Sequence, residues 1–146
     1  MNKLLIFLLL FSAFKSNAQL KKPVTWSYAG KKISATEAVI YIRATIDNGW
    51  HIYSSNQKDG GPKKTSFSFS GAGFSLVGKV LEPKPIIKYE NVFDMDVLYF
   101  EKNVVFSQKI RLLAKQLVVK GKVEFMACTD KECLPPDEIS FSIPIK

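Results

Sequence analysis

Apolar and polar residues alternate with a period of two over almost the whole chain after residue 18. In residues 37–46, EAVIYIRATI, every second residue from Ala38 to Ile46 is apolar. Successive side chains of a β-strand point to opposite faces of a sheet, so this segment is predicted to be a strand with one buried face. The same alternation recurs in residues 66–70, 103–112 and 139–146. No segment of this region shows a convincing helical period.

Turn-forming residues separate the alternating segments. They lie at residues 48–49, 59–62, 71–73 and 82–85, which are rich in Gly, Pro, Asn and Asp. About seven to nine short strands joined by such turns are typical of an all-β fold, with an immunoglobulin-like antiparallel β-sandwich as the commonest arrangement. The sequence contains no internal repeat and no interdomain linker, so we expect one domain over residues 19–146.

The N-terminus has the features of a secretory signal peptide. Lys3 precedes an apolar run from Leu4 to Phe14, and Ser16-Asn17-Ala18 is a small-x-small cleavage pattern. The apolar run is shorter than the roughly 20 residues of a membrane-spanning helix. We therefore expect residues 1–18 to be removed after Ala18, leaving a soluble, exported domain without a stable membrane anchor.

The chain is basic, and the pattern of its charges argues against a nucleic acid partner. The formal net charge is +8, and removing the two lysines of residues 1–18 leaves +6. Lysines are scattered over expected strands and turns instead of forming a stripe interleaved with aromatic residues. The charge favours solubility and attraction to acidic partners. Nothing in the sequence suggests an obligate dimer, so we expect a monomer.

Both cysteines lie close together, in the segment FMACTDKECLPPDEI of residues 125–139. Val123, Phe125 and Ala127 are expected on one face of a strand, with Cys128 on the other. A turn at residues 129–132 would bring Cys133 opposite Cys128, with Cα atoms about 5.5 Å apart, as a disulfide requires.

The spacing alone leaves the purpose of this pair open. A disulfide that closes so short a loop contributes only about 2 kcal/mol to the free energy of unfolding, which is little for a structural crosslink. A structural disulfide, a redox-active disulfide and a metal site all remain possible on spacing. Few metal ligands accompany the cysteines: the chain has one histidine, His51, and the turn between the cysteines adds the carboxylates of Asp130 and Glu132. Two such ligands do not make a convincing zinc site. We expect the chain to work without a metal or organic cofactor.

The run CTDKECLPP, placed between two expected strands, resembles the active-site segment of the N-terminal periplasmic domain of DsbD, the transmembrane thiol:disulfide interchange protein. Two further stretches are similar to that family. DNGWHIYS, residues 47–54, resembles a strand beside the active site, and residues 89–110 resemble its cap loop with the flanking strands. The resemblance extends over nearly all of residues 19–146 in the same order.

The resemblance implies an immunoglobulin-like electron relay in the periplasm, a thiol-disulfide oxidoreductase in type. A membrane thiol reductase would reduce the cysteine pair, which would then reduce disulfides of exported thioredoxin-fold proteins. By this resemblance Cys133 attacks the partner's disulfide, and Cys128 resolves the mixed disulfide. The chemistry agrees, because exchange by thiolate attack needs an exposed, close pair on a loop that a partner can approach.

The resemblance also implies a surrounding set of residues. Phe93 matches the phenylalanine of a mobile loop that covers the cysteines, while His51 and Tyr53 match two flanking aromatic positions. Pro135 and Pro136 remove two backbone donors and are expected to keep the loop after the cysteines from pairing as a strand.

The sequence departs from familiar members of the family in three places. The insert between the cysteines is shorter, Asn91 and Val92 replace acidic residues, and His51 replaces an aromatic residue. These changes leave the reduction potential open. Two other functions are open as well: an immunoglobulin-like binding or adhesion module with a structural disulfide, and a metal carrier.

Overall fold

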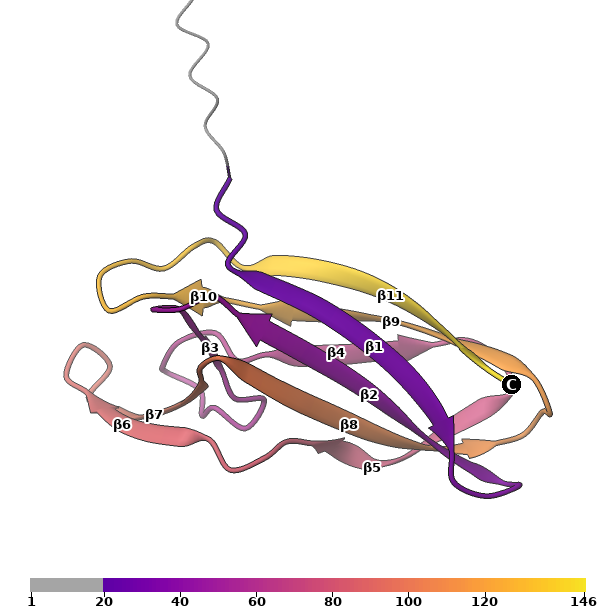
Figure 1. Cartoon of the computed structure of the whole chain (residues 1–146). Helices are drawn as coiled ribbons and strands as arrows, with labels where there is room; N and C mark the ends of the chain where they lie inside the picture. Colours follow the sequence, from indigo (N-terminus) through magenta and orange to yellow (C-terminus); the bar gives the residue numbers. More distant parts are fainter. Residues whose placement is uncertain (1–19) are drawn as a thin grey trace, which may run out of the picture.

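A computed structural model describes residues 20–146, which form β-strands and no helix (Figure 1). The strands in chain order are β1 (Val24–Lys32), β2 (Glu37–Ile46), β3 (His51–Tyr53), β4 (Ser66–Ser70), β5 (Phe74–Leu81), β6 (Ile86–Glu90), β7 (Met95–Phe100), β8 (Asn103–Leu112), β9 (Leu117–Phe125), β10 (Ala127–Cys128) and β11 (Asp137–Ile145). The predicted signal peptide, residues 1–18, lies outside the described residues. In the part that is described, no helix is long and apolar enough to cross a membrane.

The strands form three antiparallel sheets. Sheet A has the order β1-β2-β8-β5, sheet B the order β10-β3-β7-β6, and sheet C the order β11-β9-β4. Sheets A and C are the two layers of the sandwich, and sheet B continues it at one end (Figure 1). The immunoglobulin-like β-sandwich predicted from the sequence is confirmed.

The main core lies between sheets A and C, and the period-two alternation creates it. The apolar positions of β2 and β8 that the alternation predicted to share a face are buried, among them Ile40, Ile42 and Phe106. Ile40 and Ile42 pack in one cluster with buried residues of β9 and β11, such as Val119 and Ile143, whereas Phe106 packs in a second cluster that includes Phe125 of β9. Removing these side chains from water is the dominant stabilising contribution to such a fold.

The expectation of one continuous strand running into Cys128 is wrong. Strand β9 ends at Phe125 in sheet C, and β10 pairs with β3 in sheet B after a break at Met126. Because the chain changes sheets there, Ala127 and Cys128 are both buried, on opposite faces of sheet B. Breaks of this kind also raise the number of strands above the expected seven to nine.

Sheet B has two faces with different surroundings, and this positions the cysteines. Its inner face packs into the core through Ile52, Phe100 and Ala127. Its outer face holds a separate small cluster made of Tyr53, Val97 and Cys128. The β6–β7 turn and the connection from β10 to β11 both lie at this end of the molecule, away from the C-terminus (Figure 1).

Candidate redox site

A short hairpin after β10 carries the two cysteines, which form a disulfide. The Leu134 amide donates to the Ala127 carbonyl at 2.9 Å, and the Thr129 amide donates to the Glu132 carbonyl at 2.8 Å. Cys128 and Cys133 therefore lie opposite each other between two hydrogen-bonded positions. Cα atoms approach most closely at such positions, to about 4.5 Å, which explains why the observed 4.0 Å is shorter than the expected 5.5 Å.

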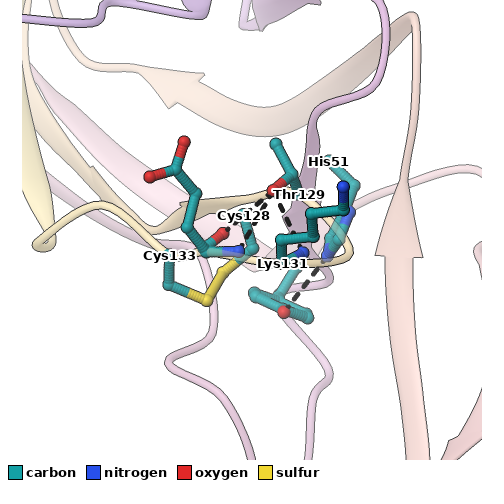
Figure 2. The surroundings of a disulfide bond; sticks show 7 residues. His51, Cys128, Thr129, Lys131 and Cys133 are labelled. Atoms are coloured by element: carbon teal, nitrogen blue, oxygen red, sulfur yellow. Dashed lines mark hydrogen bonds between the residues drawn. A yellow bond between two sulfur atoms is a disulfide. The ribbon is translucent and has the colours of Figure 1, made fainter.

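Local hydrogen bonds shape the turn between the cysteines. The Thr129 hydroxyl accepts from the amides of Lys131, at 3.2 Å, and Glu132, at 3.1 Å (Figure 2). A side-chain hydroxyl that bonds to amides two and three residues later is a common way of fixing a tight turn. The turn predicted at residues 129–132 is confirmed. The hairpin thus has its own hydrogen bonds and does not depend on the disulfide alone.

The N-terminal segment and the two prolines flank this hairpin. Lys21 forms an ion pair with Glu132 and lies 5.8 Å above the ring of Trp50. On the other side, backbone pairing ends at Leu134, and Pro135 and Pro136 are exposed and outside any strand. That the two prolines keep this part of the chain from pairing as a strand stays a prediction.

The two cysteines differ sharply in exposure. Cys128 is 1% exposed, whereas Cys133 is exposed at the surface of the hairpin. The expected exposed pair is thus exposed only at Cys133, because β10 places Cys128 on sheet B against Tyr53 and Val97. Of the two cysteines, Cys133 is therefore the one that the fold leaves open to an approaching thiol or disulfide.

A row of ring-bearing side chains continues from Cys128 across the outer face of sheet B. His51 lies opposite Cys128 in the pairing of β3 with β10, and Tyr99 lies opposite Tyr53 in the pairing of β3 with β7. His51 Nε2 and the Tyr53 hydroxyl are 3.2 Å apart, and the His51 and Tyr99 rings are 5.0 Å apart between centroids. Figure 2 shows His51 on the strand beside Cys128, linked to the neighbouring hydroxyl.

Burial dominates the protonation behaviour of this row. Desolvation lowers the pKa of His51 from 6.5, although the Asp130 and Glu101 carboxylates act in the opposite direction. Desolvation also raises the pKa values of Tyr53 and Tyr99 above 10, so both hydroxyls keep their protons at neutral pH. Near pH 7 the row is therefore neutral, with a histidine able to accept a proton.

Buried polar contacts hold β3 in its place. The Ser54 amide donates to the Leu98 carbonyl at 2.9 Å, and the Leu98 amide donates to the Gln57 side chain at 2.7 Å. The buried Thr65 hydroxyl donates to the Tyr53 carbonyl at 2.6 Å. Because these groups are satisfied only in this arrangement, they fix the strand that carries His51 and Tyr53.

Phe93 lies in the turn between β6 and β7, at the same end of the molecule as the hairpin. The Phe93 amide donates to the Glu90 carbonyl at 3.1 Å, and the side chain is 38% exposed. Met95, which begins β7 just after this turn, packs against the cluster of Tyr53, Val97 and Cys128. The cap role of Phe93 stays a prediction.

The structure adds residues that the sequence did not single out. Tyr99, Lys88, Glu90 and Glu101 line a small depression together with His51 and Asp130. The alternation of Met95, Val97 and Tyr99 in β7 signals a shared face, but only the pairing of β7 with β3 places that face beside Cys128. Within residues 20–146, no three His, Cys, Asp or Glu side chains gather closely enough to hold a metal ion.

Solved structures with the same fold include N-terminal domains of two proteins, ScsB and DsbD. The N-terminal periplasmic domain of ScsB from Proteus mirabilis aligns with a TM-score of 0.61 and 15% identity, over 84% of this chain and 46% of that one, so this chain spans about half of its length. The reduced N-terminal domain of DsbD from Neisseria meningitidis aligns at 0.55 and 14%, over 80% of this chain and 82% of that one.

A third structure is that of the complex between the DsbD and PilB N-terminal domains from Neisseria meningitidis, with a TM-score of 0.54 and 12% identity, over 86% of this chain and 88% of that one. At these identities the likeness shows a shared fold. A search of curated protein sequences finds no match. The family profile described as "Thiol:disulfide interchange protein DsbD, N-terminal" matches residues 20–144. Since that match spans nearly all of the described residues, this chain belongs to the family of DsbD N-terminal domains.

Proposed function

We propose that this chain is an exported electron-relay domain that passes reducing equivalents by thiol-disulfide exchange at Cys128 and Cys133. The observation that carries the proposal is the hairpin disulfide between one exposed residue, Cys133, and one buried residue, Cys128. A purely structural disulfide does not need a cysteine that is open to a partner. An electron relay needs a cysteine that a partner can reach, because thiol-disulfide exchange starts by direct attack at sulfur.

The difference in exposure supports distinct roles for the two thiols. In the reduced protein the Cys133 thiolate attacks a sulfur of the partner's disulfide, and one partner thiolate leaves. The Cys128 thiolate then attacks the Cys133 sulfur and releases the second partner thiolate. The partner gains two electrons and two protons, and the chain is left with the Cys128–Cys133 disulfide.

The partners we propose are exported thioredoxin-fold proteins, with a membrane thiol reductase restoring the dithiol. The complex of a related DsbD domain with a PilB domain supports a protein as the partner. Beside Cys133, residues 20–24 and 134–136 line a groove on the surface, where part of such a partner can lie. Phe93 acts as the cap, lying over the sulfurs until a partner displaces it, and residues 1–18 serve as the export signal.

The test uses single substitutions and an oxidised thioredoxin-fold protein. After acid quenching and alkylation, the reduced Cys128→Ser variant should carry a mixed disulfide through Cys133, and the Cys133→Ser variant should carry none. The wild type should yield reduced partner and its own intramolecular disulfide. Lys120→Gln, on the exposed face of β9, serves as a control and should match the wild type. Equal exchange by the wild type and both cysteine variants would contradict the proposal.

A further inference from the structure

Resolution of the mixed disulfide requires a proton to leave a buried thiol. Cys128 must become a thiolate to attack the Cys133 sulfur, yet it is 1% exposed and packs against Tyr53 and Val97. Apolar surroundings disfavour a thiolate, and they also keep water from taking the proton. A proton acceptor close to Cys128 would remove this obstacle.

His51 is the base that the fold places beside Cys128. The two residues are directly opposite each other in the β10–β3 ladder, so their side chains project on the same face with Cβ atoms about 4.5–5.5 Å apart. Figure 2 shows His51 on the neighbouring strand, with Cys133 on the opposite side of the view. His51 is also the one histidine in the sequence.

We propose that His51 is the proton acceptor for Cys128, and that it sets the rate of the resolving step without affecting the first attack by Cys133. The inference rests on the proposed function, since it assigns a positioning and proton-accepting residue to the second half of that exchange.

The contacts of His51 suit this task. The Tyr53 hydroxyl lies 3.2 Å from Nε2 and can accept a hydrogen bond from the Nε2–H group. In that tautomer the lone pair that can take a proton is on Nδ1. Tyr99 packs on the imidazole at 5.0 Å, and Tyr53 packs edge-on at 5.3 Å. The ring is thus oriented by contacts from two strands before any proton moves.

Charged groups from every neighbouring element face this imidazole. Asp130 comes from the hairpin turn, Glu101 follows β7, and Lys88 and Glu90 come from β6. Burial lowers the pKa of His51, so the ring is neutral and able to accept a proton near pH 7. The nearby carboxylates then stabilise the imidazolium, whose proton leaves to water through the half-buried edge of the ring.

The aromatic disulfide DTNB separates the two steps because each releases one thionitrobenzoate anion. Cys133 thiolate attacks DTNB, forms a mixed disulfide and releases the first anion. Cys128 then gives its proton to His51 and attacks the Cys133 sulfur, which releases the second anion and closes the protein disulfide. The dithiol is oxidised by two electrons, and DTNB is reduced by two.

The expected result is a selective loss in the second phase. In His51→Gln the first release should keep its rate, whereas the second should slow about a hundredfold near neutral pH, the lower end of the effect of a positioned base. The second-phase rate of His51→Gln should then rise about tenfold per pH unit, as for a thiol deprotonated by solvent. The second-phase rate of the wild type should level off above the pKa of His51. Tyr53→Phe, which keeps the ring but frees Nε2, should slow the second phase less.

Each alternative outcome has a distinct meaning. If His51→Gln and the wild type show the same second-phase rate and pH profile, the role of His51 is refuted while the relay stands. If the wild type reacts at neither cysteine, the proposed function fails and this inference fails with it. Should His51→Gln fold poorly, the second-phase rate of Tyr53→Phe decides, because an unchanged rate in that variant overturns the inference.

Discussion

Reduction of the Cys128–Cys133 disulfide should lower the free energy of unfolding by about 2 kcal/mol and leave the protein folded. The cysteines are five positions apart, so the bond closes a very short loop. Chain-entropy arithmetic for such a loop gives about 7 cal/mol/K, which is about 2 kcal/mol at 25 °C. For a domain of this size that loss corresponds to a decrease of about 7 °C in the melting temperature.

The hairpin should keep its shape after reduction, because hydrogen bonds from Leu134 and Thr129 and the pairing of β10 with β3 do not involve sulfur. Urea unfolding of the oxidised and the reduced protein measures the difference, and the slope of free energy against denaturant should stay the same. A loss above about 5 kcal/mol, or unfolding on reduction, would refute the reasoning. The disulfide would then hold the fold together, and the protein could not alternate between two folded redox states.

Three further predictions concern the cap, the histidine and the core. Phe93→Ala should raise the rate at which a small alkylating reagent reacts with reduced Cys133, as stopped-flow measurements would show, and an unchanged rate would count against the cap. Since burial lowers the pKa of His51 in the folded state, stability should be complete above pH 6.5 and decrease as pH falls through the folded value. Urea titrations at about pH 7.5 and about pH 5 test this. The free energy of unfolding of His51→Gln should fall less between these two pH values than that of the wild type. Phe106→Ala should cost about 3–5 kcal/mol, because Phe106 is 0% exposed and packs against three other aromatic rings, and a loss below about 1 kcal/mol in urea unfolding would contradict that packing.

Much of the sandwich could be predicted from the sequence because its signals are local. The alternation in residues 37–46 and 103–112 places the buried side chains correctly, since each residue's face depends only on its position along a strand. The turn at residues 129–132 could be predicted as well, because it is held by local hydrogen bonds from the amides of Lys131 and Glu132 to the Thr129 hydroxyl. Local patterns of this kind need no knowledge of which strands pair.

The surroundings of Cys128 could not be predicted in the same way, because they depend on strand pairing. The alternation continues through Met126 without a visible break, although the chain leaves sheet C there and joins sheet B. Val97 shares a cluster with Cys128, and Tyr99 packs against that cluster, only because β7 pairs with β3. The burial of one cysteine and the exposure of the other follow from that pairing and not from the spacing of the cysteines.

The reduction potential of the Cys128–Cys133 pair tests the central claim most directly. It is measured by equilibrating the purified protein in glutathione buffers of graded potential and alkylating the free thiols. A relay should titrate at roughly −250 to −180 mV, where exported thiol proteins exchange electrons. A value below about −300 mV, with no reduction by glutathione, would identify a structural disulfide and contradict the account.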